Sequence, residues 1–369
     1  MGRLGLRRTT RSASLVLAVA GAVTLTGCAA VNERGGVVGA GTQLGGTING
    51  SGSSAQQAAM QAWMAGFAAE QPGVTVNYDP VGSGGGREQF LDGAVTFAGS
   101  DAALDAEELE QAIERCGESG VFELPNYISA IAVVYQLEGV AELNLTAEVV
   151  ARIFDGQVTR WNDPAIAADN PGVALPDLGI TAVHRSDKSG TTENFTEYLA
   201  AAGAGAWPYE PDGEWPTGGG EAANGNSGVV AAVGSGNGTI GYADVSQAGD
   251  LGVARIRVGE QFVAPSPEAA AAVVEGSERQ PDRGKYDFAI ELNRTTSDPG
   301  EYPLVLVSYH IGCLTYPSAD EVGALSEFLV YVISEQGQLD AAEAAGSAPI
   351  TNMLRGQALT AIDAITVQQ

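Results

Sequence analysis

The chain has 369 residues, a formal net charge of −27 at pH 7 and only two histidines. This excess of acidic side chains argues against a nucleic acid partner, because phosphate backbones attract clustered lysine and arginine. The length exceeds what a single hydrophobic core usually serves, so we expect two domains.

The first 27 residues have the order of a signal peptide. Arginines open the segment, an apolar run follows from Leu15 to Leu25, and Leu25-Thr26-Gly27-Cys28 ends it. The run is well short of the roughly 20 residues that span a bilayer as a helix. The ending resembles the bacterial lipoprotein signal, in which the cysteine becomes the lipidated N-terminus. We predict a signal peptide at 1–27 and lipidation of Cys28; a buried apolar helix with an incidental cysteine is the alternative.

This ending predicts an exported chain, anchored to the outer face of the cell membrane by lipidated Cys28. Removing the signal peptide takes away Arg3, Arg7, Arg8 and Arg11 but no acidic residue, so the exported chain is still more acidic. Residues 28–45 are rich in glycine and lack periodicity, which predicts a flexible tether between the anchor and the folded part.

From Thr47 onward, short β-like runs alternate with helical ones, which is typical of an α/β fold. The first series comprises a strand through Ile48, a helix from Ser54 that carries Met60, Trp63, Met64 and Phe67, a strand through Val74, Val76 and Tyr78, a short helix with Phe90 and Leu91, and a strand from Val95 to Gly99. The loops after these strands fall at the edge where open α/β sheets bind ligands.

After Cys28 only Cys116 and Cys313 remain. Two thiols in an exported protein usually pair, so we predict a Cys116–Cys313 disulfide. It would place an early and a late segment of the chain side by side. Two separate buried thiols are the alternative.

Two long apolar strands are predicted in the rest of the chain, from Ile128 to Tyr135 and from Tyr302 to Ile311. Between them lie a strand from Ile180 to Val183, a helix with Phe195, Tyr198 and Leu199, and a strand through Ile240 and Tyr242; two amphipathic helices follow the second long strand. The long strands suit crossings between two lobes. We predict lobe I at 46–131 plus 306–369 and lobe II at 132–305.

Three loops combine glycine with small or hydroxyl residues and directly open a predicted helix. They are Gly52-Ser53-Ser54-Ala55, Gly82-Ser83-Gly84-Gly85-Gly86 and Lys188-Ser189-Gly190-Thr191. A helix N-terminus offers unpaired N–H groups and the positive end of the helix dipole, and glycine lets the backbone approach a ligand closely. Facing one point, the loops would form an anion cage, whereas each alone is also typical of an ordinary cap or turn.

Two charged residues define the expected anion further. Arg185 precedes Ser189 by four residues and could add guanidinium donors, with a surface ion pair as the alternative. Asp101 would repel an anion, but an ionised carboxylate can accept a hydrogen bond from a P–OH group. Fully deprotonated sulfate has no such proton, so the carboxylate favours phosphate. Capping of the helix near Asp105 is the alternative role for Asp101.

Together these motifs resemble the high-affinity phosphate-binding proteins of bacterial phosphate ABC importers, the PstS family. The resemblance runs from about Thr47 to the last helices. Its most specific pieces are Gly-Ser-Gly-Ser-Ser at 50–54 with Trp63, Val-Asn-Tyr and Gly-Ser-Gly-Gly-Gly within 76–86, Phe-Ala-Gly-Ser-Asp at 97–101, Arg-Ser-Asp-Lys-Ser-Gly-Thr-Thr at 185–192, and Gly-Thr-Ile-Gly-Tyr at 238–242.

The resemblance implies a two-lobed α/β periplasmic-binding-protein fold, type II-like, with the lobes joined by two crossing strands. It also implies the phosphate ligands Ser54, Ala55, Ser83, Asp101, Arg185, Ser189, Gly190 and Thr191. Position 55 is often aromatic in the family and is alanine here, which should preserve a contact through the main-chain amide. Lys188 stands where glycine is common, which changes the local charge.

We therefore expect an extracytoplasmic solute-binding lipoprotein that captures inorganic phosphate between its lobes and delivers it to the permease subunits of an ABC importer. We expect a monomer with no cofactor, no metal, no enzymatic activity and no membrane contact except its lipid. A binding protein for sulfate or molybdate is the alternative, and phosphate sensing or adhesion would be compatible with the same site. A phosphoester hydrolase using Ser83 is weaker, because no base is identifiable for it, although the chain has His184 and His310.

Overall fold

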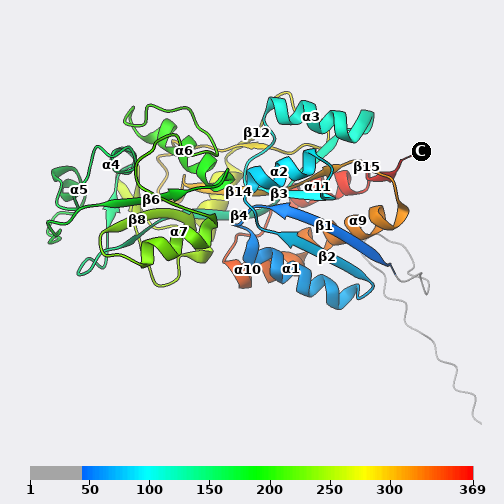
Figure 1. Ribbon diagram of the computed structural model, residues 1–369, viewed down its shortest axis with the longest axis horizontal. Helices are drawn as coiled ribbons and strands as arrows, with labels where there is room; N and C mark the ends of the chain where they lie inside the picture. Colours follow the sequence, from blue (N-terminus) through cyan, green and yellow to red (C-terminus); the bar gives the residue numbers. More distant parts are fainter. Residues whose placement is uncertain (1–43, 369) are drawn as a thin grey trace, which may run out of the picture. The chain divides into compact units, whose positions relative to one another are not determined.

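The computed structural model describes residues 44–368 (Figure 1). The predicted signal peptide, Cys28 and nearly all of the predicted tether lie outside the described residues. Within that range, no helix is both long enough and apolar enough to cross a membrane.

One sheet of nine strands organises the described chain, in the order β2-β1-β3-β14-β4-β8-β6-β7, with β9 also paired to β4. Its strands are β1 Gly46–Gly52, β2 Val74–Asp79, β3 Phe97–Ser100, β4 Val121–Gln136, β6 Thr181–Arg185, β7 Glu221–Ala223, β8 Thr239–Asp244, β9 Gly252–Val253 and β14 Val305–Cys313. β1 is parallel to β2 and β3, and β6 is parallel to β7 and β8. β14 and β4 run antiparallel to each strand beside them.

The remaining strands are short and form three small sheets, β11-β10-β5, β12-β13 and β15-β16. Their bounds are β5 Asn144–Leu145, β10 Arg255–Val258, β11 Gln261–Val263, β12 Glu278–Arg279, β13 Ile290–Glu291, β15 Thr315–Tyr316 and β16 Thr366–Val367.

Helices pack against the large sheet and bury its apolar side chains. They are α1 Gln57–Glu70, α2 Ser83–Leu91, α3 Ala106–Cys116, α4 Ala147–Phe154, α5 Pro164–Asp169, α6 Gly190–Ala202, α7 Gly225–Gly234, α8 Pro267–Glu275, α9 Ala319–Ile333, α10 Glu335–Ala345 and α11 Asn352–Ile362, with 3₁₀ turns η1 Gly117–Ser119 and η2 Val245–Gln247. α2 and α9 contact β1, and α1 contacts β2, whereas α7 contacts β6, β7 and β8. The α/β class predicted from the alternating pattern is therefore observed.

β4 joins the two halves of the sheet. Residues 121–130 of β4 pair with β14, and residues 131–136 pair with β8. Every residue of the strand before Gln136 is buried. The strand begins at Val121, earlier than the predicted Ile128, because its first part lies inside the sheet with polar residues such as Glu123 and Asn126 buried there. Apolar periodicity alone could not reveal that part.

Three further predictions about helices and strands are corrected by the structure. α1 begins at Gln57, not at Ser54. The Ser53 hydroxyl accepts from the N–H groups of Ala55 at 3.0 Å and Gln56 at 3.5 Å, which satisfies them in a turn before the helix. β14 covers Val305–Cys313 and not 302–311.

The third correction concerns the end of the chain, where three helices follow β14 instead of two. α9 and α10 are separated at Ser334, whose extended backbone ends α9. Its hydroxyl accepts from Gly337 N–H and caps α10. A serine between two apolar periodic stretches was therefore a helix boundary, and α11 completes the set.

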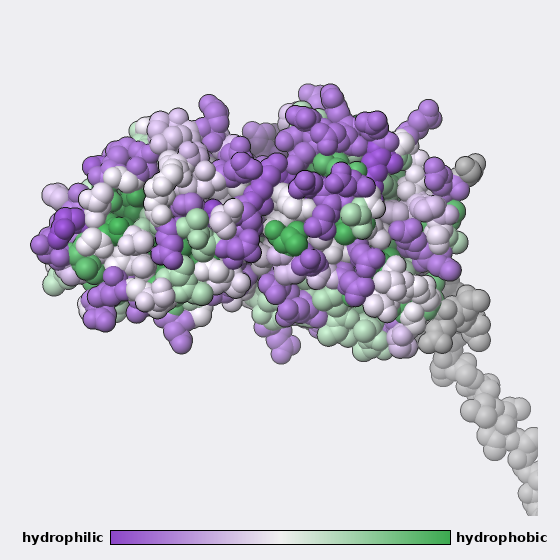
Figure 2. Space-filling view, viewed as in Figure 1, coloured by the Kyte–Doolittle hydropathy of each residue, from purple (hydrophilic) through white to green (hydrophobic). Residues whose placement is uncertain are grey.

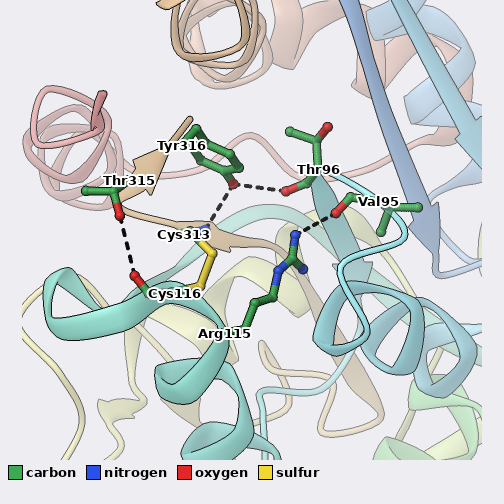
Figure 3. The surroundings of a disulfide bond; sticks show 7 residues. All are labelled: Val95, Thr96, Arg115, Cys116, Cys313, Thr315 and Tyr316. Atoms are coloured by element: carbon green, nitrogen blue, oxygen red, sulfur yellow. Dashed lines mark hydrogen bonds between the residues drawn. A yellow bond between two sulfur atoms is a disulfide. The ribbon is translucent and has the colours of Figure 1, made fainter. Parts of the chain in front are cut away.

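The predicted disulfide is confirmed: Cys116 at the end of α3 is bonded to Cys313 at the end of β14, with the Cα atoms 5.2 Å apart (Figure 3). Polar contacts surround it. Cys313 N–H donates to the Tyr316 hydroxyl at 3.0 Å, and that hydroxyl donates to the Thr96 carbonyl at 2.9 Å. Arg115 donates to the Val95 carbonyl at 2.8 Å. The disulfide thus ties α3 to the edge of the sheet where β3 begins.

The outer face of α3 carries part of the acidic excess. Figure 2 shows hydrophilic side chains gathered over α3, with hydrophilic, neutral and apolar areas intermixed over the rest of the face in view. Glu107, Glu110 and Glu114 on this helix are exposed, while Ala112 and Cys116 are buried. Most acidic residues of the helix therefore lie on its exposed side, whereas Glu108 is buried and pairs with Arg87 and Lys188.

Replacing both Cys116 and Cys313 with serine should destabilise the protein, because the bond joins residues 197 positions apart and restricts the unfolded chain. We expect the free energy of unfolding to fall by about 3–5 kcal/mol, measured by urea denaturation. The wild-type protein unfolded under reducing conditions is the control and should match the variant. A variant with the same unfolding midpoint as oxidised wild type would contradict this role.

Candidate functional site

The Asp101 carboxylate, which directly follows β3, collects hydroxyl groups from three distant segments. Its Oδ1 accepts from Ser53 Oγ at 2.5 Å and Ser308 Oγ at 2.6 Å, and its Oδ2 accepts from Thr191 Oγ1 at 3.1 Å. Asp101 is 3% exposed. A carboxylate has about four acceptor positions, so these three bonds leave about one on Oδ2.

Asp101 does not cap the following helix. Asp105 is the N-cap of α3: its side chain accepts from Glu108 N–H at 2.8 Å, and the Glu108 side chain accepts from Asp105 N–H at 3.2 Å. This reciprocal capping box satisfies the start of α3 without Asp101. The alternative role considered for Asp101 is therefore excluded, and its carboxylate serves the buried cluster.

Three predicted site serines accept hydrogen bonds from N–H groups through their hydroxyl oxygens. The hydroxyl proton of each serine therefore has no acceptor among these contacts. Ser83 Oγ accepts from Asp101 N–H at 3.1 Å, and Ser189 Oγ accepts from Thr192 N–H at 3.2 Å as the N-cap of α6. Ser54 Oγ accepts from Asn226. A hydroxyl that accepts from N–H groups still has one proton to donate. Each serine is buried, so each can offer that proton to a ligand away from bulk water.

Arg185, the last residue of β6, is held by one carboxylate. Its Nε donates to Asp187 Oδ1 at 2.8 Å, and its Nη2 pairs with Asp187 Oδ2. Its Nη1 is buried and has no hydrogen-bond partner among residues 44–368. Burial would raise the pKa of Asp187, but the hydrogen bonds and charge of Arg185 and the Gly225 N–H lower it. The ionised carboxylate thus orients the guanidinium and leaves Nη1 available to an oxyanion.

Gly190 allows the start of α6 to approach the end of β3. A Cβ atom at this position would lie 2.7 Å from Ser83 Oγ and 2.9 Å from Asp101 Cβ, closer than side chains tolerate. Glycine therefore brings the first N–H groups of α6, which have no partner within a helix, next to Ser83 and Asp101. On the other side, Ala55 is fully buried and its N–H faces the Ser53 hydroxyl.

The structure connects four of the predicted site residues, Ser54, Ser83, Asp101 and Thr191, through hydrogen bonds. Asp101 links Ser83 to Thr191, and Asn226 links Thr191 to Ser54. Sequence reasoning missed four contributors: Ser53, Asp187, Asn226 and Ser308. Ser53 and Asp187 lie inside motifs that were recognised, whereas Asn226 and Ser308 lie in a helix and a strand without a local signature.

Lys188, the departure from the family pattern, pairs with an acidic residue of α3. Its ammonium lies 3.4 Å from Glu108, which also pairs with Arg87 at 2.9 Å. Arg87 in turn lies 3.5 Å from Glu193. Burial raises the pKa of Glu193 to about 7; Arg87 and Lys188 oppose the rise, and Glu197 and Glu108 add to it. These charges form a network between α2, α3 and the start of α6.

Neither histidine contacts the serines of the predicted site. His184 stacks on Trp215 with ring centroids 4.9 Å apart, and its Nδ1 contacts the Arg185 carbonyl at 2.9 Å. His310 is fully buried beside Phe97 and Phe328, and this burial lowers its pKa to about 3. Neither ring is placed as a base for Ser83, which removes the residue basis for a serine hydrolase.

A cavity of about 600 Å³ opens beside the cluster. It is lined by residues of the loop after β3, of α6, of the 280–294 segment and of β14, among them Asp101, Asn194, Arg294 and Tyr309. Arg294 is held by Asn194, by Glu197 at 2.7 Å and by main-chain carbonyls. The cavity gives solvent a route close to the carboxylate while the hydroxyl contacts remain buried.

Comparison with known proteins places the chain in a class and then in a family. A family model described as a PBP superfamily domain matches residues 38–336. Phosphate-binding protein PstS2 of Mycobacterium bovis BCG is 34% identical over 367 residues, covering 96% of this chain and 98% of the relative. The chain belongs to the PstS phosphate-binding protein family, as its motifs predicted. Membership makes it a binding protein and not an enzyme.

Solved structures confirm the periplasmic-binding-protein fold. The high-affinity periplasmic phosphate-binding protein PfluDING, solved with phosphate, has a TM-score of 0.71 at 22% identity and covers 84% of this chain and 92% of its own. A putative phosphate ABC transporter substrate-binding protein from Clostridium perfringens has a TM-score of 0.60 at 17% identity and covers 83% of this chain and 100% of its own.

Asp244, the last residue of β8, is a fully buried carboxylate beside the site. Its Oδ1 accepts from Tyr127 Oη at 3.1 Å and from Ser246 N and Oγ at 2.9 and 2.5 Å. Its Oδ2 has no hydrogen-bond partner among the residues described. Burial raises the pKa of Asp244 to about 6; Ser246 and Ser129 oppose the rise, and the charge of Asp101 adds to it.

The raised pKa makes Asp244 destabilising at neutral pH. The folded state retains its proton between the pKa of the unfolded chain, about 4, and about 6, so stability from this group falls as pH rises through that window. Asp244→Asn removes the ionisation and keeps the shape. We expect its unfolding free energy, relative to wild type, to increase by roughly 2–3 kcal/mol between about pH 4 and about pH 7 in urea denaturation. A pH-independent difference would contradict the shifted pKa.

Proposed function

We propose that this protein is an extracytoplasmic lipoprotein that captures inorganic phosphate and delivers it to the permease subunits of a phosphate ABC importer. Family membership supports phosphate binding, because its relatives and structural neighbours are described as phosphate-binding proteins. One neighbour is described as a putative phosphate ABC transporter substrate-binding protein, which supports the transport role. The protein acts as a monomer without cofactor, metal or nucleic acid.

The observation that carries this proposal is the single remaining acceptor position on a carboxylate surrounded by donors. Asp101 is saturated on Oδ1 and holds one bond on Oδ2. The proposed donors to the anion are Arg185 Nη1, the hydroxyls of Ser54, Ser83 and Ser189, and the main-chain N–H groups of Gly190 and Thr191. The Thr191 hydroxyl proton goes to Asp101, and the Ala55 N–H donates to Ser53 Oγ. A tetrahedral anion with one proton matches this set, since it accepts many hydrogen bonds and donates one.

The free acceptor position of Asp101 also explains how the site would select phosphate over sulfate although the protein is strongly acidic. Sulfate has no proton at neutral pH, so it would leave the last acceptor position of Asp101 unpaired in a buried site. An unsatisfied buried acceptor facing a negative charge costs several kcal/mol. The net charge of −27 acts mostly at long range, where salt screens it beyond about 8 Å. Fixed local donors therefore decide which anion binds.

We assign the site to the boundary between two lobes, 46–131 plus 306–369 and 132–305. The change of partner along β4, from β14 to β8 at Ile131, supports this division. The proposed ligands come from both sides: Ser54, Ser83 and Asp101 from one, and Arg185 and the start of α6 from the other. The chain then crosses between the lobes once within β4 and once at the start of β14, and closing the lobes on the anion buries it.

We propose that the chain is exported by its first 27 residues and held at the outer face of the cell membrane by lipid on Cys28. The motif Leu25-Thr26-Gly27-Cys28 supports this, and the 28–45 segment supplies the tether. Such an anchor keeps the binding protein close to the importer and prevents its loss from the cell.

Changing Asp101 to asparagine should weaken phosphate binding and reduce discrimination against sulfate. The amide cannot accept on both sides, and its N–H groups would face hydroxyl protons and the P–OH. We expect about a 10- to 100-fold higher Kd for phosphate and a smaller ratio between the two anions, measured by calorimetric titration of ligand-free, lipid-free protein. Asp105→Asn is the matched control, because asparagine still caps α3.

Two results would contradict the proposal. Wild-type protein that gives no heat with phosphate would contradict phosphate binding. Sulfate that competes with phosphate at similar concentrations would contradict the selectivity role of Asp101 and would favour a binding protein for another tetrahedral oxyanion.

Changing Cys28 to serine should move the protein from the membrane fraction to the soluble fraction, because the thiol is the proposed site of lipid attachment. Fractionation of bacterial cells, with mass measurement of the purified protein, checks this. Thr26→Ser preserves the cysteine and a small hydroxyl residue, and it should leave the protein in the membrane fraction. Membrane retention of the Cys28→Ser protein equal to wild type would rule out the anchor.

A further inference from the structure

Asn226, near the start of α7, lies outside every predicted ligand motif yet contacts two of the proposed ligands. It is fully buried. Its main-chain N–H donates to Ser54 Oγ at 3.2 Å, and its Nδ2 donates to the same oxygen at 3.1 Å. Nδ2 also lies 3.3 Å from Thr191 Oγ1. One side chain therefore joins residues that are 172 and 35 positions away along the chain.

The orientation of the Asn226 amide is fixed by its other end. Its Oδ1 accepts from the Asp244 main-chain N–H at 2.8 Å. A main-chain N–H can only donate, so the amide oxygen must face Asp244 and the amide nitrogen must face Ser54 and Thr191. Rotating the amide by 180° would place two donors against each other in a buried environment.

This orientation sets the direction of the hydrogen bonds beyond it. Ser54 Oγ accepts two N–H bonds from Asn226, which uses both of its acceptor positions and leaves it only a proton to offer. Thr191 Oγ1 accepts from Asn226 and donates its proton to Asp101 Oδ2. Ser54 thereby becomes an obligatory donor toward the anion, and Thr191 becomes an obligatory donor toward the carboxylate.

Gly225, the residue before Asn226, helps to position Arg185 through Asp187. Gly225 has φ of +69°, a conformation that favours glycine, and its N–H donates to Asp187 Oδ1 at 3.0 Å. Asp187 holds the Arg185 guanidinium. The start of α7 therefore contacts two proposed anion ligands, Ser54 and Thr191, and the carboxylate that holds a third, Arg185, while supplying no ligand itself.

We infer that Asn226 is a positioning residue for anion binding, which acts by aiming the Ser54 hydroxyl at the anion and the Thr191 hydroxyl at Asp101. This inference rests on the proposed phosphate-binding function. Because Ser54 and Asn226 belong to different proposed lobes, their bonds form when the two sides meet. Asn226 thus makes the full donor set depend on contact between the lobes.

The test uses Asn226→Asp, which keeps the shape and the acceptor for Asp244 N–H but removes both Nδ2 protons. A carboxylate there would accept the Ser54 proton and draw it away from the anion. We expect the Kd for phosphate to rise about 100-fold near pH 8, measured by calorimetry against wild type. Towards about pH 5 the introduced carboxyl group takes up a proton and can donate again, so the ratio of the two Kd values should fall to within about tenfold.

Asn237→Asp is the matched control. Asn237 is exposed and accepts from Glu138 N–H through Oδ1, so the change adds the same charge and keeps that bond. It should bind phosphate like wild type at every pH. Should Asn226→Asp fail to fold, a double-mutant cycle between Asn226→Ala and Ser54→Ala replaces it. The loss caused by Asn226→Ala should then be at least about threefold smaller when Ser54 is already alanine.

The outcomes separate this inference from the proposed function. Wild-type protein that binds no phosphate contradicts the proposed function itself. Wild-type binding with an Asn226→Asp Kd within about threefold at every pH contradicts the positioning role alone. A large loss whose ratio to wild type does not change with pH also contradicts it, because that result assigns the effect to fold or charge and not to a missing donor.

Discussion

The structure depends on one buried negative charge that must be paired. Burying a carboxylate without donors is strongly unfavourable, so the Asp101 site requires hydroxyls from elsewhere in the chain. They come from the loop after β1, from α6 and from β14. Satisfying one carboxylate therefore holds three segments of distant sequence at one point, and the donors left over around it define which ligand fits.

The large sheet supports the residues around Asp101 from both of its halves. β4 runs without interruption from its pairing with β14 to its pairing with β8, and nearly all of it is buried. Parallel strands on each side end toward the cluster, so each half contributes loop residues from its carboxyl edge. Gly190 removes the one side chain that would keep α6 away from Asp101. Close backbone approach, and not a surplus of positive charge, brings together the donors of the proposed anion site.

The sequence predicted the α/β class, the disulfide and the three loops, because strand ends, glycine and hydroxyl residues leave local patterns. It missed the buried polar start of β4, since Glu123 and Asn126 interrupt the apolar run. It also missed Ser308 and Asn226. A serine in a strand and an asparagine in a helix are common anywhere, and only the three-dimensional contacts with Asp101 and Ser54 distinguish them.

The Cys116–Cys313 bond also determines what happens when a single peptide bond of the chain is cleaved. Everything between these two cysteines, including all the residues of β6, α6 and α7, forms a covalent ring. A protease that cuts once within the ring leaves both fragments in a single molecule, with the C-terminal helices still attached to the N-terminal part. Under oxidising conditions the protein therefore tolerates a nick in one of its surface loops without losing either piece, and only reduction would release them.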